Sequence, residues 1–261
     1  MNYQNILFET KDGIARLTFN RPERLNSFNT EMHAEVRAAL ASVPAAARVL
    51  IITGAGRGFC AGQDLNDRAV APGAAPPDLA DSIEKNYKPL VLALRALPLP
   101  VIAAVNGVAA GAGANIALAC DLVIAARSAS FVQAFAKLGL VPDSGGTWFL
   151  PRLVGNARAL GLTLLGDKLP AEQAAEWGLI WRCVEDAELA AVVETLARGF
   201  AGAPTRGLAR TKQAIYEGLN RTLAQQLDVE RDFQGELGRS ADYAEGVAAF
   251  AQKRAPQFTG Q

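Results

Sequence analysis

The chain has little histidine and little cysteine. His33 is the only histidine among 261 residues, and it falls in a predicted amphipathic helix as a surface or packing residue. This disfavours a Ser-His-Asp triad and any metal site that needs several histidine ligands. The three cysteines, Cys60, Cys120 and Cys183, lack metal-ligand spacing and fit the reduced thiols of a cytoplasmic protein. No metal site is therefore expected.

The chain also lacks an excess of one charge and an uninterrupted hydrophobic run. Lys and Arg together number 26, as do Asp and Glu, so no attraction to nucleic acid or to a membrane surface is expected. Residues 96–120 are uncharged, but prolines, glycines and asparagines interrupt them. They therefore predict a buried strand, a turn and a helix rather than a membrane span. The first residues do not resemble a signal peptide, which again favours the cytoplasm.

The first half of the chain has the pattern of an α/β protein. Residues 6–10 and 14–19 predict two strands joined by a turn at Asp12-Gly13. Asn29 is a candidate cap for a helix that runs to Leu40. Three short apolar runs, 49–53, 101–105 and 122–126, are typical of buried parallel strands. A helix of small residues, 113–119, lies between the last two runs, and this order favours βαβ crossovers.

The second half of the chain predicts helices. From Arg158 onward the expected breaks fall at Gly166, Gly178 and Pro204. Residues 69–77 are rich in Ala, Pro and Gly and predict a loop beside the functional site.

Two glycine-rich turns, at residues 54–58 and 111–113, carry the strongest chemical signal. The dinucleotide-binding pattern G-x-G-x-x-G fails in both, because the third glycine is replaced by Phe59 in one and Ile116 in the other. Small residues at a helix start instead allow backbone N–H groups to approach a ligand and to stabilise a negative oxygen. The alternative is that these turns only connect strands to helices.

Three motifs together resemble the crotonase, or enoyl-CoA hydratase/isomerase, superfamily. They are Phe59-Cys60-Ala61-Gly62-Gln63-Asp64, Gly111-Ala112-Gly113-Ala114-Asn115 and Pro142-Asp143-Ser144-Gly145-Gly146. The resemblance covers nearly the whole chain and implies an α/β crotonase fold. Its expected parts are a spiral core of repeated ββα units over residues 1–200 and a helical trimerisation region over residues 201–261.

The resemblance also implies the roles of particular residues. The backbone N–H groups of Gln63 and Ala112 would form an oxyanion hole, and Asp143 would be the catalytic acid and base. Asn115 and Phe135 occupy positions where relatives often carry glutamates, and with Gly111 they would line the substrate pocket. The residues implied to bind coenzyme A (CoA) are Arg24, Ala61, Asp64, Leu65, Phe250 and Lys253. In relatives the last two often serve a neighbouring subunit, and a solvent-exposed lysine is the alternative for Lys253.

The missing glutamates favour proton transfer by one carboxylate over addition of water, because hydration needs two acid–base groups. Longer segments, among them residues 137–143 and 238–243, resemble a family member that rearranges a ring epoxide of phenylacetyl-CoA to an oxepin and shifts 3-enoyl-CoA to 2-enoyl-CoA. Such an enzyme would need no cofactor beyond the CoA of its substrate and would form a homotrimer or hexamer. The alternatives are an atypical hydratase, a dienoyl-CoA isomerase and a non-catalytic RNA-binding relative. For Asp143 alone, the alternative is a simple turn residue.

Overall fold

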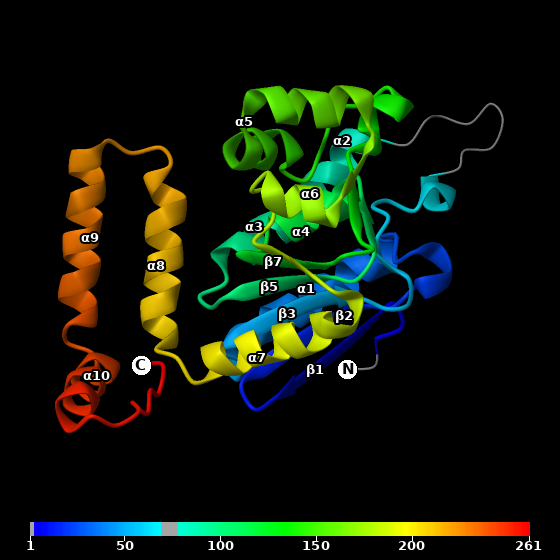
Figure 1. Cartoon of the computed structure of the whole chain (residues 1–261). Coiled ribbons are helices and arrows are strands. Elements are labelled where there is room, and N and C mark those ends of the chain that lie inside the picture. The colour runs from blue at the N-terminus through cyan, green and yellow to red at the C-terminus, as the bar shows by residue number, and fades with distance from the viewer. Residues whose placement is uncertain (1–2, 69–77) are drawn as a thin grey trace.

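In the computed structural model, which describes residues 3–68 and 78–261, a six-stranded sheet forms the centre of the molecule (Figure 1). Its order is β1, β2, β3, β5, β7 and β10, which span Ile6–Lys11, Ile14–Phe19, Val49–Gly54, Val101–Val105, Leu122–Ala126 and Arg182–Val184. β1 and β2 are antiparallel, and all other neighbours are parallel. The expected hairpin is confirmed, with φ angles of 52° and 75° at Asp12 and Gly13.

A second sheet of four short strands lies beside the first. Its order is β4, β6, β8 and β9, which span Gly58–Cys60, Val108–Ala110, Ser130–Val132 and Lys168–Pro170. The chain visits the two sheets alternately, since β4, β6 and β8 directly follow β3, β5 and β7. A helical segment follows each of these short strands, so the expected ββα unit is repeated along the core.

Helices pack against the central sheet. The N-terminal helices are α1 (Thr30–Ala46), α2 (Leu79–Ser82) and α3 (Lys88–Ala96), with a π-helical turn at Ile83–Tyr87. Asn29 caps α1, because its side chain accepts a 2.9 Å hydrogen bond from the Met32 N–H. α1 continues beyond the expected end at Leu40 to Ala46. α7 (Leu189–Ala201) packs on β3, β5 and β7.

The core is continuous through the centre of the sheet. Every residue of β5 is buried, and so is every residue of the short helix α4 (Ala112–Leu118), which begins one residue before the expected start. His33 is 2% exposed and packs against the rings of Phe28 and Tyr87, so its expected role as a packing residue is correct and a surface position is wrong.

The remaining helices are α5 (Gly146–Leu165), α6 (Ala171–Glu176), α8 (Thr205–Gly218), α9 (Leu223–Leu237) and α10 (Ala241–Gln252). The expected breaks are confirmed, because Gly166 ends α5, Gly178 follows α6 and Pro204 precedes α8. The expectation of helices alone was wrong, since β9 and β10 interrupt them. These strands have three residues each, too few to show a periodic pattern.

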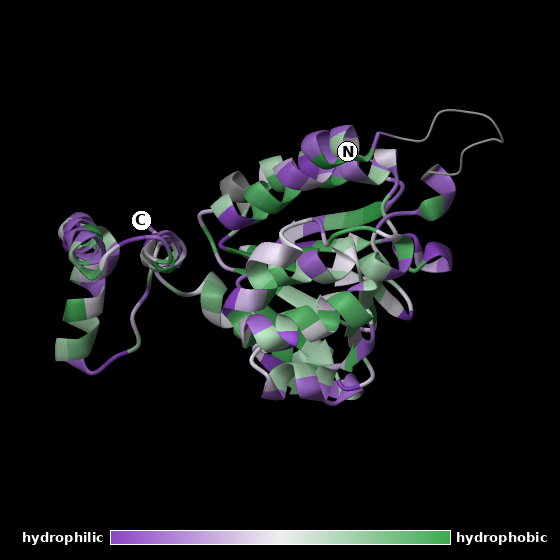
Figure 2. Cartoon of the chain, turned by 90° about the horizontal axis from the view of Figure 1, so that it is seen from above, coloured by the Kyte–Doolittle hydropathy of each residue, from purple (hydrophilic) through white to green (hydrophobic). Residues whose placement is uncertain are grey.

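The last three helices stand apart from the sheets. In Figure 1 α8 and α9 run side by side at the left, and α10 lies at the foot of α9 beside the C-terminus. Figure 2, seen from above, shows the same separation and a mixture of polar and apolar residues on these helices. Within the described residues, no helix is both long and apolar enough to cross a membrane. The loop expected at residues 69–77 falls outside the described residues.

Candidate active site

β4 and α4 approach each other so closely that only glycine fits between them. A Cβ atom on Gly113 would lie 2.3 Å from the Cys60 carbonyl oxygen. A Cβ atom on Gly62 would lie 2.9 Å from the Ala110 oxygen and 3.2 Å from the Ala112 nitrogen. Two of the three motifs identified in the sequence, residues 59–64 and 111–115, are therefore in contact, which brings Gln63 and Ala112 into one region.

The hydrogen bonds around Gln63 fix the direction of its backbone. The Phe28 N–H donates to the Gly62 oxygen at 2.7 Å, and the Asp64 N–H donates to the Phe28 oxygen at 2.9 Å. In this parallel bridge the Gln63 N–H points away from Phe28. Ala112 is the first residue of α4, so its N–H has no acceptor within the helix. The surroundings of Gln63 and Ala112 are called the oxyanion region below, after the role that the resemblance implies for their N–H groups.

A buried tyrosine that the sequence analysis missed holds the Gln63 side chain. The Tyr87 hydroxyl donates a 2.8 Å hydrogen bond to Gln63 Oε1, and Tyr87 is 0% exposed. Tyr87 ends the π-helical turn, where i→i+5 hydrogen bonding replaces the i→i+4 pattern and changes the direction of the side chains that follow. Nothing in the local pattern of the sequence indicates this turn.

Asp143 lies on a tight turn whose next two residues have left-handed backbone angles. Ser144 has φ 50° and Gly145 has φ 84°. The Ser144 hydroxyl donates a 2.9 Å hydrogen bond to Asp143 Oδ1, and the Gly146 N–H donates to the Asp143 carbonyl at 2.8 Å. Asp143 itself is partly exposed, while Ser144 is buried. Hydrogen bonds thus hold both the side chain and the backbone of Asp143 in this turn.

Asn115 connects this turn to the helix that begins at the oxyanion region. Its Nδ2 donates a 2.8 Å hydrogen bond to the Asp143 carbonyl oxygen. Its Oδ1 accepts a 2.8 Å hydrogen bond from Gln133 Nε2. Asn115 is 0% exposed and lies one helical turn after Ala112. Asn115 was predicted as a site residue from the sequence, whereas Gln133, in the segment after β8, was not.

Phe135 lies beside the oxyanion turn. It is 7% exposed, and a Cβ atom on Gly111 would be 3.7 Å from its Cζ atom. Gly111 has φ 53° and is joined to β8 through its N–H, which donates to the Val132 oxygen at 2.8 Å. The structure thus brings Gly111, Phe135 and Ala112 together and adds an apolar wall there.

The residues of the N-terminal half that are expected to bind CoA differ in their exposure to solvent. Arg24 and Leu65 are exposed, whereas Asp64 is buried. Arg21 Nη2 lies 3.0 Å from Asp64 Oδ2. Burial raises the pKa of Asp64, but the hydrogen bonds from Arg21 and the Asn66 N–H, with the charge of Arg21, lower it to a net value below the usual range.

Ala61 lies in the same turn, since its N–H donates to the Leu25 oxygen at 2.9 Å. Arg21, which was not singled out in the sequence, thus fixes the loop that carries the other residues.

Phe250 and Lys253 are remote from these residues. They belong to the end of α10, and Phe250 is 88% exposed. α10 lies on the far side of α8 from the sheets (Figure 1). Within one copy of the chain, the structure does not bring these two residues to the oxyanion region.

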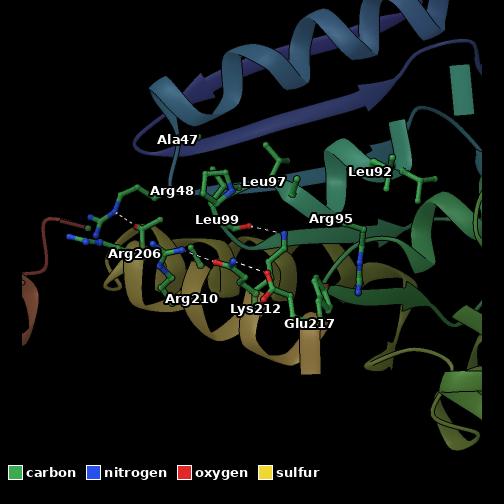
Figure 3. Close-up of a pocket in the computed structure, with 18 of the residues that line it drawn as sticks. Ala47, Arg48, Leu92, Arg95, Leu97, Leu99, Arg206, Arg210, Lys212 and Glu217 are labelled. Atoms are coloured by element: carbon green, nitrogen blue, oxygen red, sulfur yellow. Dashed lines mark hydrogen bonds between the residues drawn. The ribbon is translucent and has the colours of Figure 1, made fainter. Parts of the chain in front are cut away.

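A groove of about 1400 Å³ lies between α8 and the core (Figure 3), and none of the expected site residues line it. It reaches the Asp143 turn only at Gly145. Its charged groups are used to hold α8, because Lys212 Nζ lies 2.9 Å from Asp121 Oδ2 and donates to the Leu99 oxygen at 3.2 Å. Burial lowers the pKa of Lys212, although Asp121 raises it. The groove therefore joins the C-terminal helices to the core and is separate from the oxyanion region.

The site contains one carboxylate on a fixed turn, backbone donors at a helix start and an apolar wall. This set of groups can move a proton while a negative oxygen is stabilised. In residues 3–68 and 78–261, no group of three or more His, Cys, Asp or Glu side chains is placed to hold a metal ion.

Comparison with known proteins gives consistent matches over the full length. The family model described as enoyl-CoA hydratase/isomerase matches residues 9–261. The 1,2-epoxyphenylacetyl-CoA isomerase of Escherichia coli K12 is 60% identical over 258 residues, which are 98% of each chain. A probable enoyl-CoA hydratase of Rhodobacter capsulatus is 49% identical over all of both chains. A crystal structure of a putative enoyl-CoA hydratase/isomerase from Mycobacterium abscessus has a TM-score of 0.94 and 34% identity, and the match covers 98% of this chain and 100% of that one.

Proposed function

Because the chain belongs to the enoyl-CoA hydratase/isomerase family, as its motifs indicated, we propose that it is an acyl-CoA isomerase that uses Asp143 as acid and base. Its substrates would be ring-1,2-epoxyphenylacetyl-CoA, which rearranges to oxepin-CoA, and 3-enoyl-CoA, which becomes 2-enoyl-CoA. Neither conversion gains or loses atoms. The family and the crotonase fold rest on the matches above, whereas the substrates are supported by the 60% identity to the Escherichia coli isomerase.

In the double-bond shift, Asp143 removes a proton from C2 of the 3-enoyl thioester. The electron pair moves onto the thioester oxygen, where the N–H groups of Gln63 and Ala112 stabilise the enolate. The protonated Asp143 then delivers the proton to C4, and the double bond moves from C3–C4 to C2–C3. One carboxylate serves both steps, so no second acid and no cofactor are required.

The observation that carries this proposal is the chemistry of two positions beside the site. Asn115 has an amide that is already bonded to Gln133 and the Asp143 carbonyl, and Phe135 has no polar side-chain atom. Neither can activate water, whereas Asp143 has a carboxylate held by Ser144. This combination favours isomerisation over hydration.

The CoA part of the substrate would be held by residues of two copies. We assign Arg24, Ala61, Asp64 and Leu65 to the copy that supplies Asp143, and Phe250 and Lys253 to a neighbour in a homotrimer or hexamer. Exposed apolar residues on the C-terminal helices support such an assembly, since contact with another copy would cover them. They include Leu223, Leu227, Val247 and Phe250, all more than half exposed.

The test compares wild type, Asp143→Asn and Asp167→Asn, in which the last removes an exposed carboxylate after the end of α5. Each is incubated with a 3-enoyl-CoA while thioester conjugation and product mass are followed. We expect conjugation without a change in mass, retained in Asp167→Asn and reduced by at least about a hundredfold in Asp143→Asn. A product heavier by one water would instead identify a hydratase. RNA binding without turnover of either proposed substrate would favour a binding protein.

A further inference from the structure

Asp143 is held by a chain of buried amides that begins outside the catalytic motifs. Gln133 donates to Asn115, and Asn115 donates to the Asp143 carbonyl, with both distances 2.8 Å. Gln133 is 3% exposed and Asn115 is 0% exposed. Hydrogen bonds in such dry surroundings are stronger than in water and hold their partners in narrow orientations.

The direction of this chain follows from the Asp143 carbonyl. A carbonyl oxygen accepts hydrogen bonds and cannot donate them, so Asn115 must present its NH₂ group to Asp143. The Asn115 oxygen then faces Gln133, which must present its own NH₂ group. No group among the described residues donates to Gln133 Oε1, so Asn115 is the contact that orients the Gln133 amide. Each amide is thus oriented by the next group towards the turn.

The same carbonyl receives a second hydrogen bond from the Gly146 N–H at 2.8 Å. Gly146 lies against Asn115, because a Cβ atom there would be 2.5 Å from Asn115 Nδ2. The peptide that carries the catalytic carboxylate is therefore held between the start of α5 and the middle of α4. α4 is also the helix whose first N–H belongs to the oxyanion region.

We propose that Gln133 and Asn115 form a positioning relay that fixes the Asp143 carboxylate relative to the oxyanion donor on α4. This inference rests on the proposed function of Asp143. Asn115 has no acid–base role in it, although it occupies a position where relatives often carry a glutamate. Its amide sets the geometry of proton transfer, and an error of about 1 Å there is enough to slow a reaction about a hundredfold.

The experiment uses three variants, Asn115→Leu, Gln133→Met and the double variant, all close in size to wild type. The control is Ile116→Val, which trims a fully buried side chain on the same helix and leaves the relay intact. For each protein, kcat and KM are measured with a 3-enoyl-CoA, together with the thermal unfolding midpoint.

The relay predicts that kcat falls at least about tenfold in Asn115→Leu while KM changes less than about twofold, because the groups that bind CoA are untouched. Gln133→Met should lower kcat in the same direction, and the double variant should be no slower than Asn115→Leu, since both act through one contact. Ile116→Val should lower the unfolding midpoint with kcat unchanged. If Asn115→Leu does not fold, Gln133→Met still tests the relay, because its side chain lies outside α4.

Two results overturn the relay alone, provided that the wild type is active. In the first, kcat is unchanged in both Asn115→Leu and Gln133→Met. In the second, the losses of kcat in the two single variants multiply in the double variant. A wild type that isomerises neither the 3-enoyl-CoA nor the ring epoxide overturns the proposed function and the relay with it. The wild-type rate therefore separates the two failures.

Discussion

The Tyr87 hydroxyl donates a 2.8 Å hydrogen bond to the Gln63 side chain, and so a buried phenol on a π-helical turn orients a residue of the oxyanion region. Because Gln63 supplies one of the two proposed backbone donors, the position of that donor depends on a side chain 24 residues away.

We expect Tyr87→Phe to lower kcat for double-bond shifting by about fivefold, the equivalent of about 1 kcal/mol for one lost neutral hydrogen bond. The phenyl ring keeps the packing against His33 and Phe28. The measurement is steady-state kinetics with a 3-enoyl-CoA. Tyr243→Phe, at a position 58% exposed, is the control and should match wild type. Equal rates for both variants would mean that the phenol does not orient Gln63.

Gly113→Ala should disrupt the oxyanion region. The added methyl group would lie 2.3 Å from the Cys60 carbonyl oxygen, so α4 must move away from β4. We expect kcat to fall by about a hundredfold or more, as for loss of an oxyanion donor. Kinetics and circular dichroism together test this.

Gly161→Ala is the matched control, because no atom lies within 4 Å of its Cβ position in α5. It should leave kcat unchanged and stabilise the protein by about 0.5–1 kcal/mol. If Gly113→Ala behaved in the same way, the close approach of β4 and α4 would be unimportant for the reaction.

The pair of Arg21 and Asp64 should make stability depend on acid pH. The folded-state pKa of Asp64 is lowered, so the pair contributes stability above the unfolded pKa of about 4, and this contribution is lost as pH falls through the folded value. We expect Asp64→Asn to lower the free energy of unfolding by about 1–3 kcal/mol at pH 7. Urea titrations should show this difference shrinking below about pH 4. A constant difference from pH 7 to pH 3 would contradict it.

Lys212→Met should loosen the C-terminal helices. It removes an ammonium group from a buried pair and leaves Asp121 with the Tyr216 hydroxyl and the Val101 N–H as partners. A loss of about 3–5 kcal/mol is expected for breaking such a pair. Limited proteolysis between α7 and α8 should become faster. Lys137→Met, at an exposed lysine, should leave the cleavage rate unchanged.

Local patterns predicted the elements that have enough residues to show them. The apolar runs gave β3, β5 and β7, and the Asn29 cap marked the start of α1. β9 and β10 were missed because they exist only through pairing with strands distant in the sequence. Pairing of this kind leaves no periodicity in three residues.

The site was predictable where a motif required a backbone conformation. Gly62 and Gly113 were identifiable because their positions admit no side chain. Tyr87, Gln133 and Arg21 were not, since the role of each depends on a hydrogen bond to a residue far along the chain. Neither spacing nor composition reveals such a contact.

The tight contact between β4 and α4 also encloses the Cys60 thiol. Burial raises its pKa to about 12, against the effect of the Gly62 N–H, so almost no thiolate exists at neutral pH. A thiol reagent can therefore react with Cys60 only when the structure around this buried side chain opens. The rate at which Cys60 is alkylated would then measure how often the region around β4 and α4 opens in the native protein.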